Sequence, residues 1–180
     1  MNANRLVFIA LISLVSTAHA QPATFGSFKA EDQEIKFQKV LNQDSITVAK
    51  LEAFYKTLPY ISNLTTTGDA LTFNVNELVV DFKKFQFRQM DVPTLIQTGK
   101  YNGKVTVSVR DGRYRILITT IEVMGDAGYR KITSWEPLTT VACLKSGTVL
   151  NPDWCKPNSL GLLEMMFTDK LQFVPKKDDW

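Results

Sequence analysis

The sequence has very few of the residues that most often carry catalysis or bind metals. Its 180 residues include a single histidine, His19, and two cysteines. His19 falls in a segment that we expect to be removed. The mature chain then has no histidine for a Ser-His-Asp triad, a Cys–His dyad or an imidazole zinc site. It also lacks a glycine-rich phosphate loop and metal-ligand spacing, so we expect neither a cofactor nor a metal.

Long apolar runs are missing after residue 20. Residues 1–20 have the pattern of a secretory signal peptide: Arg5, an apolar core over residues 6–15, and a small-x-small end at Ala18-His19-Ala20. The core is shorter than the roughly 20 residues that a helix needs to cross a bilayer. The alternative is a retained amphipathic anchor. We predict cleavage after Ala20, no transmembrane segment in the mature chain, and a periplasmic or secreted protein.

Neither charge is in excess. The full sequence has 21 basic and 18 acidic residues, and removal of residues 1–20 takes away only Arg5. The remaining 20 basic and 18 acidic residues give a net charge of +2. Such a balanced surface gives no electrostatic reason to expect nucleic acid as a partner.

The two cysteines are Cys143 and Cys155. In an exported chain, an isolated pair predicts a disulfide, here closing a loop over residues 144–154. A loop of this length contributes about 3 kcal/mol in the chain-entropy model. The alternative is a redox pair, although the spacing is not Cys-x-x-Cys, and two thiolates without histidine make a poor zinc site.

The clearest local signal is a β-hairpin over residues 104–123. Asp111-Gly112 lies between two β-branched runs, and this dipeptide is typical of the type I′ turn of a two-residue hairpin loop. The resulting register gives the hairpin one apolar face, made of Val105, Val107, Val109, Tyr114, Ile116 and Ile118. Its other face carries Arg110, Arg113 and Arg115, and the change of apolar spacing after Ile118 predicts a bulge or the end of the sheet.

The remaining residues before the hairpin predict a leader, a strand, a helix and further strands. The leader over 21–33 is expected to be flexible. A strand over 34–41 precedes a helix over 46–58, for which Asn42, Asp44 or Ser45 would be the N-cap. An irregular edge strand follows over 61–69. From residue 71 the apolar residues alternate, with breaks at Asn76-Glu77 and Lys83-Lys84 that predict turns or bulges.

A second amphipathic helix is expected over 160–174, with Asn158 or Ser159 as its N-cap. The order of elements is then β-α-β(n)-α. It predicts an α+β fold in which an antiparallel sheet carries two helices on one face, with one disulfide loop. We expect a single domain over 34–175 and a charged tail over 176–180.

The hairpin sequence Val107-x-Val109-Arg110-Asp111-Gly112-Arg113-Tyr114-Arg115, followed by Ile-x-Ile, resembles a DUF4468-like family of secreted bacterial proteins. That family is a domain of unknown function with a TATA-binding-protein-like (TBP-like) fold. The resemblance covers residues 35–123 and the last helix, and it stops between 125 and 157. It implies export from a Gram-negative cell and supplies no catalytic residues. The name of the fold does not imply DNA binding.

Two functions remain open. The first is an exported, non-catalytic module that binds a protein, peptide or glycan at the cell envelope. Arginine and aromatic side chains carry many binding hot spots, so its candidate residues are Arg110, Arg113, Arg115, Trp135 and Trp154. The alternative is a purely structural role, in which the arginines are simply solvated and Trp154 packs against the disulfide.

The second function is a carboxylate-dependent hydrolase that acts on an envelope or extracellular polymer. Glycoside hydrolysis requires two carboxyl groups roughly 5 to 10 Å apart. The candidate acids are Glu77, Asp81, Glu122, Asp126, Glu136 and Glu164. This reading requires two inward-facing acids in one cleft, with a raised pKa.

Overall fold

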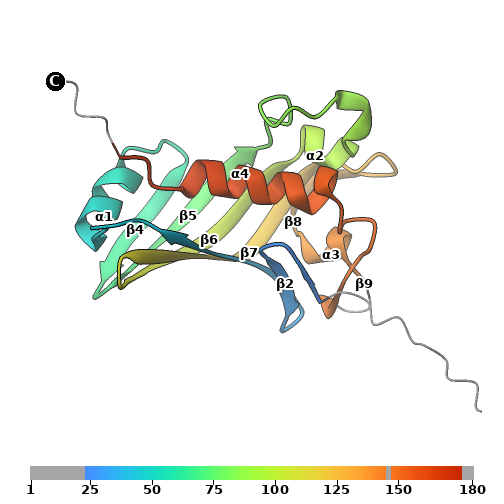
Figure 1. Ribbon diagram of the computed structural model, residues 1–180. Helices are drawn as coiled ribbons and strands as arrows, with labels where there is room; N and C mark the ends of the chain where they lie inside the picture. The colour runs from blue at the N-terminus through green and yellow to red at the C-terminus, as the bar shows by residue number, and fades with distance from the viewer. Residues whose placement is uncertain (1–22, 145–146, 176–180) are drawn as a thin grey trace, which may run out of the picture.

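The computed structural model describes residues 23–144 and 147–175. The expected signal peptide and tail lie outside these residues. An antiparallel sheet of eight strands dominates the described chain, in the order β1-β2-β3-β7-β6-β5-β4, with β8 also paired to β7 (Figure 1). Its strands are β1 Thr24–Phe25, β2 Phe28–Glu31, β3 Glu34–Asn42, β4 Ile61–Thr67, β5 Ala70–Val79, β6 Lys100–Arg110, β7 Arg113–Asp126 and β8 Lys131–Pro137. The short strands β9 Cys143–Leu144 and β10 Val149–Leu150 form a separate pair.

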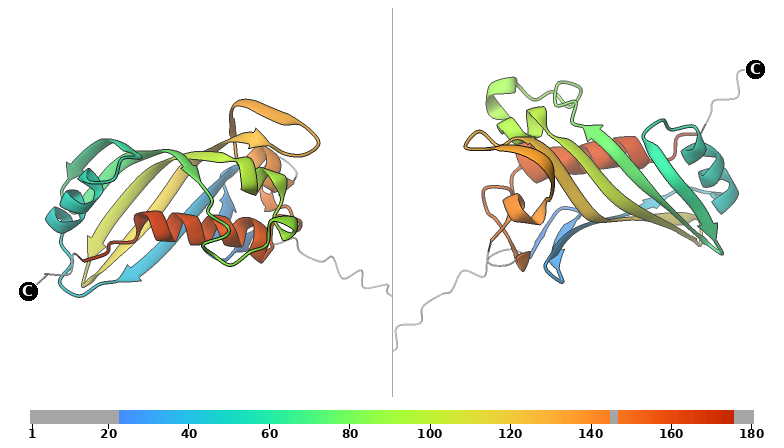
Figure 2. Two further views of the ribbon diagram at one scale, coloured as in Figure 1. Left: turned by 90° about the horizontal axis from the view of Figure 1, so that it is seen from above. Right: turned by 180° about the vertical axis from the view of Figure 1, so that it is seen from behind.

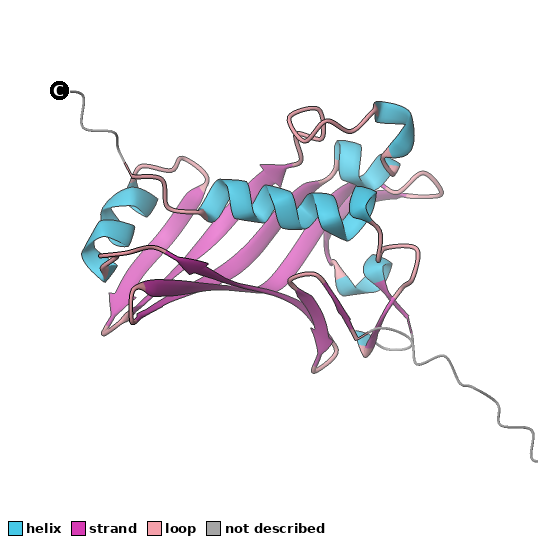
Figure 3. Cartoon of the chain, in the orientation of Figure 1, coloured by secondary structure: helices cyan, strands magenta, loops and turns pink. Residues whose placement is uncertain are grey.

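The described residues contain four α-helices rather than the two that the sequence predicted (Figure 3). They are α1 Val48–Lys56, α2 Thr94–Thr98, α3 Thr139–Ala142 and α4 Leu162–Leu171. The two short helices, α2 and α3, escaped prediction because four or five residues show too little periodicity. The α+β class and the antiparallel sheet are confirmed. Within the described ranges, no helix has both the length and the apolar character to cross a membrane.

The β6–β7 hairpin has the predicted register. Asp111 and Gly112 both have positive φ, 50° and 72°, as a type I′ turn requires. Val107 faces Ile116, Val105 faces Ile118, and all four side chains are buried. The predicted break after Ile118 is a bulge in which Thr120 has a φ of 50°. At this bulge β7 changes neighbours, since β3 pairs with it up to Ile118 and β8 from Glu122 onward.

The break at Asn76-Glu77 is also a bulge, because β5 continues through it. The register of β5 with β6 shifts between Val75 and Leu78, and Glu77 has a φ of 52°. The break at Lys83-Lys84 falls in a turn. The sequence therefore placed both irregularities correctly, and the structure assigns one to a bulge and the other to a turn.

The helix α4 crosses the inner face of the sheet (Figures 1 and 2). Its buried Phe167 packs against Phe37 of β3 and Phe28 of β2, with ring centroids 5.4 and 6.3 Å apart. Tyr55 of α1 packs against Phe73 of β5 at 4.7 Å and donates a 2.8 Å hydrogen bond to the Leu171 carbonyl. Aromatic packing thus joins the strands to both longer helices.

The predicted N-caps were wrong. The N-cap of α1 is Thr47, whose hydroxyl accepts a hydrogen bond from the Lys50 amide at 3.3 Å. Asn158 and Ser159 lie inside a π-helical turn, Pro157–Gly161, that leads into α4, and neither caps it. Ser159 is buried there instead. Several polar residues in a row offered capping oxygens, and tertiary packing decided which position began each helix.

The expectation of a flexible leader over 21–33 does not hold for its described part. Residues from 24 to 31 form β1 and β2, and β2 pairs with β3. Phe28 is only 1% exposed, because it packs between Phe37 and Phe167. The folded unit therefore begins before Glu34. A polar segment with one glycine hid a strand that contributes two buried side chains, Phe28 and Ala30.

The predicted disulfide is absent, since Cys143 and Cys155 are both free, half-buried thiols. Spacing and cellular compartment suggested the bond, but neither fixes the relative direction of two Cβ atoms, which a disulfide requires. Burial raises the pKa of Cys143 to about 11, with a further contribution from the neighbouring Cys155. Burial also raises the pKa of Cys155.

We expect thiol labelling of the unfolded, unreduced protein to find two thiols per chain. In the native protein at pH 7, labelling of Cys143 should be slow. A pKa of about 11 rather than 9.0 leaves roughly a hundredfold less thiolate, the reactive form. Labelling followed by mass spectrometry at pH 7 and pH 9 measures both rates. An unlabelled unfolded chain would show that the two sulfurs are joined in solution.

Candidate functional site

The face of the sheet opposite α4 is uncovered, and we call it the outer face. Viewed from behind the molecule, β5, β6 and β7 have no helix in front of them (Figure 2). Alternation along β6 shows how the two faces differ. Val105 and Val107 are buried toward α4, whereas Thr106 and Ser108, which alternate with them along the strand, are half-buried on the outer face.

Residues that face each other on neighbouring strands form three rows across the outer face, which we call the outer rows. Facing residues in antiparallel strands point to the same side of the sheet. The first row is Thr67, Ala70, Ser108, Arg115 and Val40; the second is Thr65, Thr72, Thr106, Leu117 and Gln38; the third is Ser62, Asn74, Lys104 and Thr119. Hydroxyl and amide side chains predominate in the second and third rows, and the first row contains two hydroxyls, Thr67 and Ser108.

The arginine cluster lies at the turn of the β6–β7 hairpin. It consists of Arg110, Arg113 and Arg115, and Arg115 also belongs to the first row. Arg110 faces Arg113 directly, and Arg115 faces Ser108. The three guanidinium groups are exposed and line a hollow of about 290 Å³. Val40 of β3, which is 52% exposed, lies in the same hollow. Sequence analysis therefore grouped the three arginines correctly.

Little acidic charge compensates the arginine cluster. Arg110 forms one ion pair, a 3.2 Å contact with the exposed Asp111. The guanidinium groups of Arg113 and Arg115 form no ion pair or hydrogen bond with any residue in the described ranges. Like charges directly opposite each other destabilise a strand pair. An oxyanion placed between the guanidinium groups would relieve this repulsion and accept paired N–H bonds.

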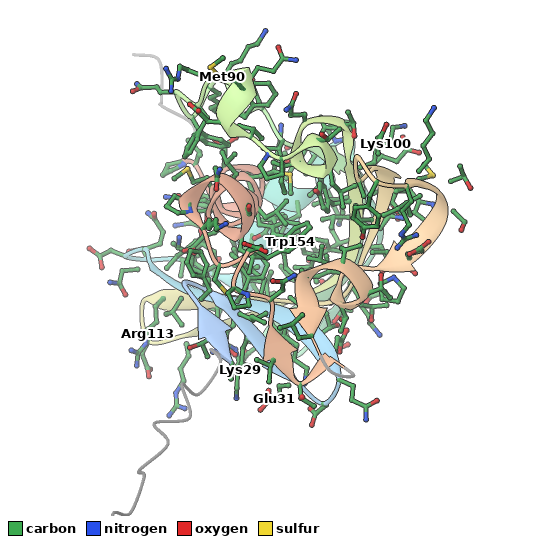
Figure 4. The ribbon with its side chains drawn as sticks, turned by 90° about the vertical axis from the view of Figure 1, so that its right-hand side faces the viewer. Lys29, Glu31, Met90, Lys100, Arg113 and Trp154 are labelled. Atoms are coloured by element: carbon green, nitrogen blue, oxygen red, sulfur yellow. The ribbon has the colours of Figure 1, made fainter. Side chains whose placement is uncertain are left out.

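The two tryptophans do not belong to this site. Trp135 is in β8, which first meets β7 at Glu122, nine residues from Arg113. At about 3.3 Å per residue, these positions are roughly 30 Å apart along the strand. Trp154 is half-buried against the core, and Figure 4 shows it away from Arg113. The structure thus brings the three arginines together and places the two tryptophans away from them.

Three of the six candidate acids, Glu77, Glu136 and Glu164, form ion pairs with cations. Asp81 and Asp126 accept hydrogen bonds from the Lys84 and Gly128 amides. Glu136 accepts two 2.7 Å bonds from Arg130, and these bonds hold its pKa below the usual value. Glu77 forms a 2.6 Å ion pair with Lys100. Glu122 is near Glu136 in register but faces Pro137, whereas Glu136 faces Val123, so the two acids point to opposite sides.

Glu164 of α4 is the most enclosed of the six acids. It accepts bonds from the Ser27 hydroxyl at 2.8 Å, the Ser27 amide at 3.1 Å and the Lys39 ammonium at 3.1 Å. Partial burial alone would raise its pKa, but these bonds outweigh burial and lower it. The carboxylate therefore fixes β2 and β3 to α4. A residue that acts as a general acid needs the opposite pKa shift.

Two larger hollows lie on the helical side of the molecule. One, of about 630 Å³, runs over α4 between Phe25 and Phe85 and includes Glu164. The other, of about 500 Å³, lies beside α1 and is lined by Phe54, Phe173 and Val174 among others. The described side chains contain no cluster of three histidine, cysteine or acidic groups that could hold a metal ion.

Comparison with known proteins gives two structural neighbours. No protein-family model matches the chain, and no curated protein sequence matches it. A crystal structure of a DUF4468 family protein from Bacteroides ovatus is similar, with a TM-score of 0.45 and 12% identity, over 84% of this chain and 94% of that one. A TBP-like protein from Parabacteroides distasonis gives 0.43 and 12%, over 77% and 87%. The first neighbour bears the name of the family that the hairpin motif resembles, and the second bears the name of that family's fold.

Proposed function

We propose that the protein is an exported, non-catalytic module that binds an anionic protein, peptide or glycan at the cell envelope through the arginine cluster. The observation that carries this proposal is that Arg113 and Arg115 have no acidic partner among the described residues, although Arg113 faces a third arginine across the hairpin. The signal-peptide pattern of residues 1–20 supports export.

The geometry of the arginine cluster suits oxyanions. Each guanidinium presents planar N–H donors that match a carboxylate, phosphate or sulfate, and it stays charged at every physiological pH. Ser108 adds a hydroxyl to the same hollow, and Val40 adds an apolar contact. The site is open to solvent, which suits a group carried on a larger partner.

The alternative, a carboxylate-dependent hydrolase, lacks its defining feature in the described residues. Glu136 and Glu164, the two candidate acids whose pKa values shift, both have them lowered by cationic and hydroxyl partners. A hydrolase would need one acid with a raised pKa beside an ionised one. The binding module is therefore the better account of these side chains.

We expect the wild-type protein to bind heparin and poly-L-glutamate, both polyanions, with an affinity that falls as salt rises. The affinity of the double variant Arg113→Ala/Arg115→Ala should be about one tenth of the wild-type affinity or lower, because the variant loses two charge-assisted donors. Isothermal titration at 50 and 200 mM salt measures both effects. Lys131→Ala, which removes an exposed cation from β8, is the matched control and should change affinity little.

Thermal melting of each variant separates binding from folding. All three proteins should melt within a few degrees of one another, because the substituted side chains are exposed. Equal loss of affinity in Lys131→Ala and in the double arginine variant would show that only net charge matters, and would refute a specific site.

A further inference from the structure

We infer that the anionic partner is an acidic glycan, carboxylated or sulfated, that lies across the outer rows with its acid groups at the arginine cluster. This inference rests on the proposed function and goes beyond it by choosing one class of partner. The arginine cluster explains why the partner is anionic. The outer rows, which share the same face, explain why it is a carbohydrate.

The outer rows offer many hydrogen-bonding groups that the fold does not use. Gln38, Thr72, Asn74, Thr106 and Ser108 make no side-chain hydrogen bond with the described part of the chain. They lie on β3, β5 and β6, and β7 lies between β3 and β6. At about 4.8 Å per strand, they span a field roughly 15 Å wide. Hydroxyls and amides both donate and accept hydrogen bonds, as the hydroxyl groups of a sugar do.

The composition of the outer rows argues against a protein as the partner. Protein interfaces have an apolar centre with enriched aromatic residues, and tryptophan and tyrosine dominate their hot spots. The outer rows contain no aromatic residue. Their apolar members are the isolated residues Ala70, Leu117 and Val40. Such a face offers hydrogen bonds rather than an apolar anchor.

A second hollow on the outer face gives the site its length. It measures about 270 Å³ and is lined by Asn74, Asn102, Lys104 and Glu122, among others. Lys104 and Arg110 are six residues apart on β6, which corresponds to roughly 20 Å. A single phosphate or sulfate ion cannot reach both hollows, whereas an extended chain can.

The two hollows carry unequal charge, and this indicates which groups of the partner lie in each. The arginine cluster places three cations in one hollow, while Glu122 and Lys104 give the other hollow one charge of each sign. Acid groups are therefore favoured at the arginine end, and hydroxyl groups at the asparagine end. A chain that carries both kinds of group along its length is an acidic polysaccharide.

Isothermal titration with four probes tests this inference: oligogalacturonate, a heparin-derived oligosaccharide, poly-L-glutamate and a DNA duplex. The variant Thr72→Val/Thr106→Val removes two hydroxyls from the second outer row and keeps β-branched side chains of nearly equal shape. We expect it to bind at least one of the two glycans about five- to tenfold more weakly, and to bind poly-L-glutamate as the wild type does. The arginine double variant should bind both the glycans and poly-L-glutamate about tenfold more weakly or worse.

Each result has a defined meaning. Binding of glycans that is insensitive to the threonine variant, or tighter binding of poly-L-glutamate or DNA than of either glycan, would overturn the glycan inference and leave the proposed anion site standing. Failure of all four probes to bind would overturn both. Preference for oligogalacturonate or for the heparin oligosaccharide identifies the acid group as carboxylate or sulfate.

Discussion

Replacing Phe167 with alanine is expected to destabilise the protein by about 3–5 kcal/mol, the usual cost of removing a buried phenylalanine. The ring is fully buried and packs on both Phe37 and Phe28. Its loss would leave a cavity between α4 and the sheet, where neither side can close the gap without moving the other. Urea unfolding followed by circular dichroism measures the change in the free energy of unfolding.

Met165→Ala is the matched control on the same helix. Met165 is 40% exposed on the outer side of α4, so its truncation should cost less than about 1 kcal/mol. If Phe167→Ala were as mild as Met165→Ala, α4 would not be packed against β2 and β3 as described. Because a large loss of stability complicates expression, the conservative variant Phe167→Leu gives an intermediate point on the same scale.

Glu164→Gln is expected to lower the free energy of unfolding by about 1–2 kcal/mol at pH 7, since it weakens three hydrogen bonds, two of them from Ser27 and one from Lys39. The effect should depend on pH with a definite sign. The folded-state pKa of Glu164 lies below the ordinary value of 4.5, so its contribution is complete above that pH and is lost as the pH falls through the folded-state pKa.

The wild type and Glu164→Gln should therefore differ at pH 7, and the difference should shrink as the pH falls through the lowered folded-state pKa of Glu164, below which both side chains are neutral. Glu52→Gln provides the control, because Glu52 forms an exposed ion pair with Lys56 on α1 and should matter little. A difference between wild type and Glu164→Gln that does not shrink as the pH is lowered below 4.5 would contradict the role given to this carboxylate.

Local chemistry made the hairpin predictable, and long-range pairing made the rest of the sheet unpredictable. Asp111-Gly112 fixes the turn, and the turn fixes every pair from Val109–Tyr114 to Val105–Ile118. By contrast, nothing near residue 37 indicates that it pairs with residue 118. The buried strand β2 escaped notice for the same reason, since its buried residues alternate over only four positions.

The candidate site divides in the same way. The arginine cluster was found because its three members share one hairpin, within six residues of sequence. The outer rows were missed because they come from five separate strands whose relative register only the structure gives. A signal was present in the alternation of Thr72 and Asn74 with apolar residues, which marked outward positions but not their neighbours.

The change of neighbours at Thr120 of β7 has a consequence for how quickly the chain can fold. The strand β7 must pair with β3, about 75 residues upstream, and with β8, just downstream. The helix α4 then packs over β2, which lies more than 130 residues earlier in the chain. Contacts of such high contact order form late, because the entropy of closing long loops is lost before they stabilise anything. The hairpin β6–β7 can form alone in microseconds, but the full sheet should take milliseconds to seconds. During that interval the edge of β7 that later pairs with β3 and β8 has no partner strand. The first half of the molecule cannot be completed until the second half has been made.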